Sequence, residues 1–68
     1  MDRLVCFKYK NYKGEICIRK VRPIEIWFGS TIYHPENQWL LKAFDVDKND
    51  YRNFAIKDIQ EWRELNAT

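Results

Sequence analysis

The stretch EICIRKVRPIEIWF, residues 15–28, decides how the strands of this 68-residue chain are arranged. Its β-branched and aromatic residues favour a strand, but it is too long to be one flat strand. The parity of its apolar positions changes twice, first from Ile16 and Ile18 to Val21 and Pro23, and then to Ile24, Ile26 and Phe28. Because side chains alternate between the two faces of a strand, each change requires a bulge or bend. Proline cannot donate a ladder hydrogen bond, so Pro23 belongs at such a bend or at an edge.

A hairpin is expected before this stretch. Residues 4–10 alternate, with Val5, Phe7 and Tyr9 on one side and polar residues or cysteine on the other. Residues 11–14 then form a turn in which Gly14 is available for a positive φ.

A polar loop and a second hairpin are expected after it. Residues 29–37 form a loop that is long for so small a domain, and long loops in compact domains are often functional. Residues 38–46 form the next strand, and a tight turn at 48–50 leads into a strand over residues 51–56.

The period changes near the C-terminus. Asp58 and Glu61 have the spacing of a capping box, and Ile59, Trp62 and Leu65 lie three residues apart. This pattern predicts a short C-terminal helix that covers one end or edge of the sheet.

These elements predict the fold class. Four or five bent antiparallel strands in a chain of this length indicate one mainly β domain, over residues 1–68, with the architecture of a small SH3-like or Sm-like barrel. Trp39, Phe54 and Trp62 are expected in its core.

Composition restricts the setting of the protein. The chain has no apolar run near the roughly 18 residues of a membrane span and no signal-peptide stretch, so we expect a cytoplasmic protein that does not enter membranes. Cys6 and Cys17 fall on facing arms of the first hairpin, where a disulfide is conceivable, but a reducing compartment favours free thiols. Two cysteines and one histidine without metal-ligand spacing argue against zinc.

Charge is distributed unevenly. Residues 1–34 carry seven Lys or Arg and three Asp or Glu, whereas residues 35–68 carry five and seven. The N-terminal half therefore presents either a positive face that attracts anionic partners or an ordinary solvated strand face.

No catalytic set is visible. His34, the one histidine, has no second catalytic partner near it, there is no Gly-rich phosphate loop, and nothing indicates a cofactor. The acidic stretch DVDKND, residues 45–50, lacks the central glycine and the final glutamate of a calcium loop, so we interpret it as a solvated turn. We predict that the protein is not an enzyme.

Cations interleaved with aromatic residues are the more informative feature. Guanidinium groups bind phosphate bidentately, and aromatic faces accept nucleobases. The candidate ligand-binding residues are Arg19, Arg22, Lys42 and Arg52, with His34, Tyr33 and Trp27 forming one wall.

The order and spacing of several short motifs resemble the WYL domain. These are Phe7-x-Tyr9 before Gly14-Glu15, Arg19-x-Val21-x-Pro23, Trp39-x-Leu41-x-Ala43, and Arg52-x-Phe54 before Asp58-Ile59. The resemblance covers about residues 5–59 and implies a bent five-stranded barrel that senses ligands. The resemblance also implies an association with helix-turn-helix regulators and with prokaryotic defence and phage systems, and a ligand that is a nucleic acid or another negatively charged, nucleotide-like molecule.

The chain departs from this family pattern at three positions. Leu40 replaces the tyrosine of the namesake motif, and Ala55 and Asp58 stand where arginines are common. The resemblance then implies a pocket that has lost an aromatic hydroxyl and two cations. Because the chain contains no helix-turn-helix, we expect it either to work with another chain or to capture a ligand as its whole task.

Three functions compete. The first is a non-enzymatic module that binds an anionic nucleotide or single-stranded nucleic acid. The second is a protein-interaction or self-assembling SH3-like module with Trp27, Phe28 and Tyr33 as anchors. The third, ranked last, is a nucleotide hydrolase that uses His34.

Overall fold

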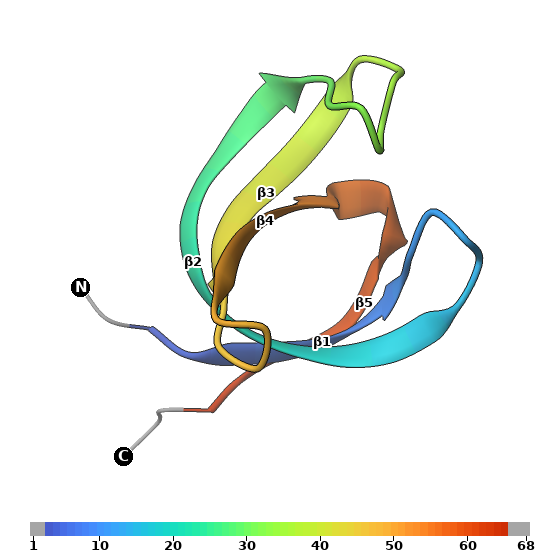
Figure 1. Cartoon of the computed structure of the whole chain (residues 1–68). Helices are drawn as coiled ribbons and strands as arrows, with labels where there is room; N and C mark the ends of the chain where they lie inside the picture. Colours follow the sequence, from blue (N-terminus) through green and yellow to red (C-terminus); the bar gives the residue numbers. More distant parts are fainter. Residues whose placement is uncertain (1–2, 66–68) are drawn as a thin grey trace.

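A computed structural model describes residues 3–65, which form one five-stranded antiparallel sheet (Figure 1). Its elements are β1 (Val5–Lys10), β2 (Ile16–Gly29), β3 (Gln38–Asp45), β4 (Asp50–Ala55), a 3-10 turn η1 (Ile56–Asp58) and β5 (Ile59–Glu64). The strand order is β4-β3-β2-β1-β5. The prediction of a mainly β domain with up to five bent antiparallel strands is confirmed.

The core lies on the inner face of the curled sheet. The strand registers place Val5 opposite Val21 and Leu41 opposite Phe54. The buried cluster consists of Val5, Phe7, Tyr9, Val21, Leu41, Ala43 and Phe54. The alternation predicted for residues 4–10 is therefore correct, and the opposite side of the sheet, which we call the outer face, carries the side chains between these positions.

One of the two bends expected in residues 15–28 is present. The register between β2 and β3 shifts between Pro23 and Glu25, which leaves Ile24 as the extra residue of a bulge. No bulge accompanies the first change, because residues 16–21 pair with β1 without interruption. Ile16 and Ile18 lie on the outer face and are exposed, so these two apolar residues mark the solvent side of the strand and not its core side.

The predicted C-terminal helix is wrong. Residues 59–64 form β5, which pairs antiparallel with β1, and only the three residues of η1 are helical before it. The register against β1 shifts between Cys6 and Lys8, where Glu61 has a φ of 55°. In this bulged strand the extra residue brings Ile59 and Trp62 toward the same side, because a spacing of three then acts as a spacing of two. The bulge therefore gave Ile59 and Trp62 a sequence spacing that is typical of a helix.

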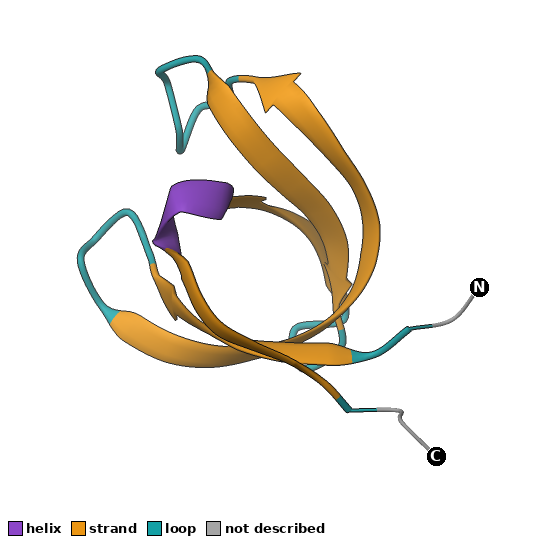
Figure 2. Cartoon of the chain, turned by 180° about the vertical axis from the view of Figure 1, so that it is seen from behind, coloured by secondary structure: helices purple, strands orange, loops and turns teal. Residues whose placement is uncertain are grey.

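The sheet curls but does not close into a barrel. β4 and β5 remain its two edges and are connected through η1 (Figure 2). A side chain spans the interior of the curl: the Tyr9 hydroxyl on β1 accepts a hydrogen bond of 2.8 Å from the backbone N–H of Ala55 at the end of β4.

A small second layer covers the outer face of β3. Trp27 lies opposite Leu40, and its indole Nε1 donates a 2.9 Å hydrogen bond to Asn53 on β4. Because β3 lies between β2 and β4, the indole must cross Leu40, which is fully buried. Gly29 allows this placement, since a Cβ there would collide with the indole ring.

The core prediction for the three large aromatic residues holds only for Phe54. Trp39 is 59% exposed and lies beyond the end of β4, whose last pair is Ala55 with Leu40, so that Trp39 pairs only with Phe28 on β2. Trp62 stacks on the core residue Phe7 with ring centroids 5.7 Å apart, but it remains 41% exposed at the sheet edge.

The cysteines are free, as favoured above. Cys6 pairs with Lys20 and Cys17 pairs with Tyr9, so the register assigns the two thiols to opposite faces. Within residues 3–65, no helix has the length and hydropathy needed to cross a membrane.

Candidate ligand-binding pocket

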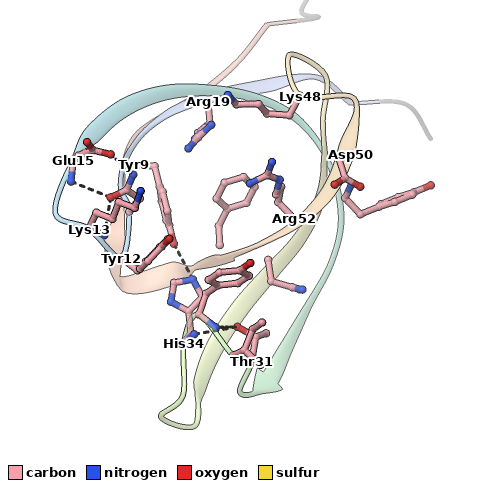
Figure 3. Close-up of a pocket in the computed structure, with 16 residues that line it drawn as sticks. Tyr9, Tyr12, Lys13, Glu15, Arg19, Thr31, His34, Lys48, Asp50 and Arg52 are labelled. Atoms are coloured by element: carbon pink, nitrogen blue, oxygen red, sulfur yellow. Dashed lines mark hydrogen bonds between the residues drawn. The ribbon is translucent and has the colours of Figure 1, made fainter.

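An open pocket of about 610 Å³ lies at one end of the inner face (Figure 3). It is bounded by the β1–β2 turn, the loop between β2 and β3, the β3–β4 turn and the inner side of β4. Segments far apart in the sequence therefore meet here because the sheet curls.

Two arginines supply the positive charge inside the pocket. Arg19 lies opposite Phe7 on β2, and Arg52 lies opposite Ala43 on β4, so both belong to the inner-face register. Figure 3 shows both guanidinium groups directed into the space between the strands. Guanidinium groups can bind phosphate or carboxylate bidentately, and here two of them are directed into one space from different strands.

The two arginines differ in their surroundings. The Arg19 side chain is 17% exposed, and its Nη1 lies 3.5 Å from Oδ2 of the buried Asp45. Arg52 is exposed and forms no ion pair with any residue in the described range. Arg52 is therefore the more available cation, whereas Arg19 is held in place.

Asp45 corrects the interpretation of the acidic stretch. Asp47 and Asp50 are exposed, as a solvated turn requires, but Asp45 is only 1% exposed. Its position at the end of β3, opposite Val21, turns its side chain toward the inner face.

The loop between β2 and β3 brings His34 to the pocket. The Thr31 hydroxyl accepts hydrogen bonds from the backbone N–H groups of Tyr33 and His34, and Thr31 and His34 also exchange two backbone hydrogen bonds. This tight turn places His34 Nε2 3.4 Å from the Tyr9 hydroxyl.

Tyr9 is in its neutral form at this contact. Burial raises the pKa of its hydroxyl above the ordinary value, with a smaller lowering by the hydrogen bond from Ala55 N–H. The hydroxyl oxygen accepts from Ala55 N–H, and the same hydroxyl group is also in hydrogen-bond contact with His34 Nε2. We therefore assign His34 a role in the wall of the pocket, fixed by the core.

Two exposed tyrosines form a rim. Tyr12 in the β1–β2 turn and Tyr33 in the long loop have ring centroids 5.4 Å apart and are 63% and 56% exposed. The turn that carries Tyr12 is fixed by Asn11, whose side-chain oxygen accepts from the N–H groups of Lys13 and Glu15, and by Gly14 at a φ of 84°. The predicted positive φ of Gly14 is confirmed.

A second depression of about 390 Å³ continues on the other side of this rim. Tyr12, Tyr33 and His34 line both spaces, and the second also contains Lys10 and Lys57. The two depressions and the tyrosine rim form one continuous surface of flat rings and charged side chains, which includes the acidic Glu15 and Asp50 in the larger depression and Glu36 and Asp58 in the smaller one.

The structure brings together four of the seven candidate residues named from the sequence. These are Arg19, Arg52, His34 and Tyr33.

The other three belong to the outer face. Arg22 lies opposite Phe44, and Trp27 covers Leu40. The Lys42 ammonium lies 5.9 Å from the centre of the Tyr51 ring. They do not line the pocket.

The lining residues that sequence reasoning did not select include Tyr12, Thr31 and Lys48. All three lie in connections rather than in strands. Tyr12 and Thr31 sit beside residues with turn or capping character, which was the only available signal for them.

Two of the departures from the family pattern lie away from the pocket. Leu40 and Ala55 are paired with each other across β3 and β4, in the register opposite to that of Leu41 and Phe54. Only Asp58 lines one of the depressions, the smaller one. The implied loss of an aromatic hydroxyl and one of the two cations therefore does not affect the arginine pocket.

Comparison with models of known protein families gives a match over nearly the whole chain. The model of the WYL domain matches residues 1–64. None of the curated proteins and no solved structure matches the chain. Within residues 3–65 there is no group of three or more His, Cys, Asp or Glu residues that could hold a metal ion.

Proposed function

Because this chain belongs to the WYL domain family, we propose that it is a non-enzymatic, cytoplasmic module that binds an anionic nucleotide-like ligand or single-stranded nucleic acid. Its task in this proposal is to sequester or sense that ligand, in a phage- or defence-associated setting that the family resemblance suggests. The strand order and the 3-10 turn before β5 support a relationship of this curled, open sheet to the SH3-like and Sm-like barrels, although β4 and β5 do not pair.

The convergence of Arg19 and Arg52 in one open pocket carries this proposal. Phosphate groups of a nucleotide match the guanidinium forks, and the exposed rings of Tyr12 and Tyr33 offer surfaces on which a base can stack. An open pocket with a continuous rim suits a ligand that extends beyond a single anionic group.

Binding of a short fluorescent single-stranded oligonucleotide, followed by anisotropy over a salt titration, tests the proposal. Each phosphate contact in a single strand contributes about 0.7 to the slope of log affinity against log salt. Arg52→Gln is expected to weaken binding by about tenfold or more and to reduce this slope.

Arg22→Gln is the matched control. Arg22 and Arg52 are both exposed arginines on strands, and the two substitutions change the net charge equally, but Arg22 lies on the outer face. The control is expected to bind nearly as well as the parent chain. Equal losses in both variants, or no binding of any oligonucleotide or nucleotide pool at low salt, would contradict the proposal.

An exposed apolar patch supports a second candidate, a protein-interaction or self-assembling module. Ile26, Phe28 and Trp39 are each more than half exposed near the free ends of β2 and β3, and the rings of Phe28 and Trp39 are in edge contact at 5.3 Å. Phe28 belonged to the predicted anchors, but Trp27 is engaged with Asn53.

Sedimentation velocity over a range of protein concentrations tests this candidate. Apolar association survives high salt, so it predicts a concentration-dependent increase in mass at high ionic strength that Phe28→Ser abolishes. A monomer at every concentration and salt would contradict self-assembly.

A further inference from the structure

Asp45 is a buried carboxylate beside the pocket that we propose binds anions. Its negative charge at this place requires a structural explanation. The side chain is 1% exposed and lies at the end of β3 among core residues. Burial of a charge is costly unless the charge is paired and hydrogen-bonded, so the contacts of both carboxylate oxygens matter.

The two oxygens of Asp45 contact two different parts of the pocket. Oδ1 accepts hydrogen bonds from the backbone N–H groups of Asp47 at 3.1 Å and Lys48 at 3.2 Å, and so shapes the β3–β4 turn. Oδ2 makes no hydrogen bond and lies 3.5 Å from Nη1 of Arg19. Arg19 and Lys48 both line the pocket.

We propose that Asp45 is a positioning residue that organises two cations of the ligand pocket, directing the Arg19 guanidinium through Oδ2 and setting the turn that carries Lys48 through Oδ1. The role in ligand binding rests on the proposed function. The contacts of Asp45 with Arg19 and with the turn do not depend on a ligand.

The contact with Arg19 orients the guanidinium without saturating it. The Arg19 Nε is buried and has no hydrogen-bond partner, and Nη1 lies 3.5 Å from Oδ2 of Asp45. Figure 3 shows the guanidinium directed into the pocket, where it remains available to an anionic group. Fixing a long side chain before binding removes part of the entropy cost that binding would otherwise carry.

A charge effect alone predicts the opposite sign. If Asp45 only adds negative potential near the pocket, its neutralisation would strengthen the binding of an anion. If Asp45 positions Arg19, neutralisation weakens binding, because the guanidinium loses its preferred orientation. The direction of the change therefore distinguishes the two roles.

Asp45→Asn tests the Arg19 contact, since an asparagine oxygen still accepts from the Asp47 and Lys48 amides. We expect its affinity for a short single-stranded oligonucleotide to fall by about three- to tenfold and its salt slope to decrease toward that of Arg19→Met. Asp47→Asn makes the same charge change at an exposed position of the same turn and should leave both values unchanged. Tighter binding by Asp45→Asn, or the same result for both variants, would overturn the inference.

A measurement without ligand separates this inference from the proposed function. The NMR order parameter of the Arg19 Nε–H group, assigned by its loss in Arg19→Lys, should fall in Asp45→Asn and stay unchanged in Asp47→Asn. An unchanged order parameter in Asp45→Asn overturns the positioning role even if oligonucleotides bind. If no oligonucleotide binds the parent chain but the order parameter falls, the proposed function fails and the positioning of Arg19 stands.

The contact with the turn is tested by Asp45→Ala, which removes both oxygens. Asp45→Ala should bind the oligonucleotide more weakly than Asp45→Asn does. In a Lys48→Met background, this additional loss of affinity should disappear. Thermal unfolding of each variant identifies any loss of the folded state, and an additional loss that persists without Lys48 overturns this half of the inference.

Discussion

The Tyr9 hydroxyl accepts a 2.8 Å hydrogen bond from the backbone N–H of Ala55, although β1 and β4 are not neighbours in the sheet. The bond crosses the interior of the curl and joins the central part of the sheet to the end of an edge strand. Because β4 and β5 do not pair, this side chain supplies part of the restraint that ladder hydrogen bonds provide in a closed barrel.

Tyr9→Phe is therefore expected to lower the free energy of unfolding by about 1–3 kcal/mol, because it leaves the buried Ala55 N–H without an acceptor. Urea denaturation measures the change. Tyr51→Phe is the control, since the hydroxyl of Tyr51 makes no hydrogen bond with residues 3–65 and its removal should have little effect. Equal effects of the two substitutions would show that the bond to Ala55 does not restrain the sheet.

The raised pKa of the Tyr9 hydroxyl also predicts a loss of stability at high pH. Burial raises its pKa in the folded state, so the folded protein binds the hydroxyl proton more tightly than the unfolded chain does. This contribution is fully present below the unfolded value of about 10 and is lost as the pH rises from there through the folded value. The stability difference between the parent chain and Tyr9→Phe should therefore narrow at alkaline pH in urea titrations. A constant difference between pH 8 and pH 11 would exclude this linkage.

Much of the fold was predictable because burial follows simple alternation in β1 and in the inner positions of β3. The prediction failed at the bulge around Glu61, where an inserted residue gave Ile59 and Trp62 the spacing of a helix. It also failed for Trp39, because the sequence does not indicate that β4 ends opposite Leu40 and leaves Trp39 without a partner on that strand.

The candidate site was predictable where its residues lie on strands with regular register. Arg19 and Arg52 face inward. Simple alternation puts Arg22, beside the buried Val21, and Lys42, between Leu41 and Ala43, on the outer face, and the bulge at Ile24 sets the face of Trp27. The partnership of Asp45 with Arg19 joins the end of β3 to β2 across the inner face, and no local pattern encodes such a contact.

Gly29 is predicted to be required for the packing of Trp27. Gly29→Ala places a methyl group where the indole lies, so the ring must move and lose its hydrogen bond to Asn53 and its cover of Leu40. We expect a loss of about 1–2 kcal/mol in the free energy of unfolding. Amide and indole hydrogen exchange should show lower protection of the Trp27 Nε1–H.

Asn53→Ala is the comparison for this prediction, because it removes the acceptor but leaves the space for the ring. Its effect should be smaller than that of Gly29→Ala. If the indole exchange rate were unchanged in Gly29→Ala, the packing of the Trp27 ring would not depend on the absence of a side chain at position 29.

Glu61 is expected to limit stability through its backbone. A φ of 55° is unfavourable for a residue with a Cβ by about 1 kcal/mol relative to glycine. Glu61 also forms an exposed ion pair of 2.9 Å with Lys8, so the two effects must be separated. In a Lys8→Met background, where the ion pair is absent, Glu61→Gly should raise the melting temperature. A lower melting temperature in this background would show that the backbone of Glu61 is not strained.

Tyr33 is expected to contribute base stacking in the ligand complex. Its ring is 56% exposed beside Tyr12 at the junction of the two depressions, so a base of a bound single strand can stack there without displacing core residues. Tyr33→Ala should weaken oligonucleotide binding by about 1–3 kcal/mol while the salt slope stays unchanged, because stacking releases no counterions. Trp39→Ala, which removes an equally exposed ring outside both depressions, should bind like the parent chain. If Tyr33→Ala instead lowers the salt slope as Arg52→Gln does, or leaves the affinity unchanged, then the rim does not contact the bases and the ligand is held by the arginine pocket alone.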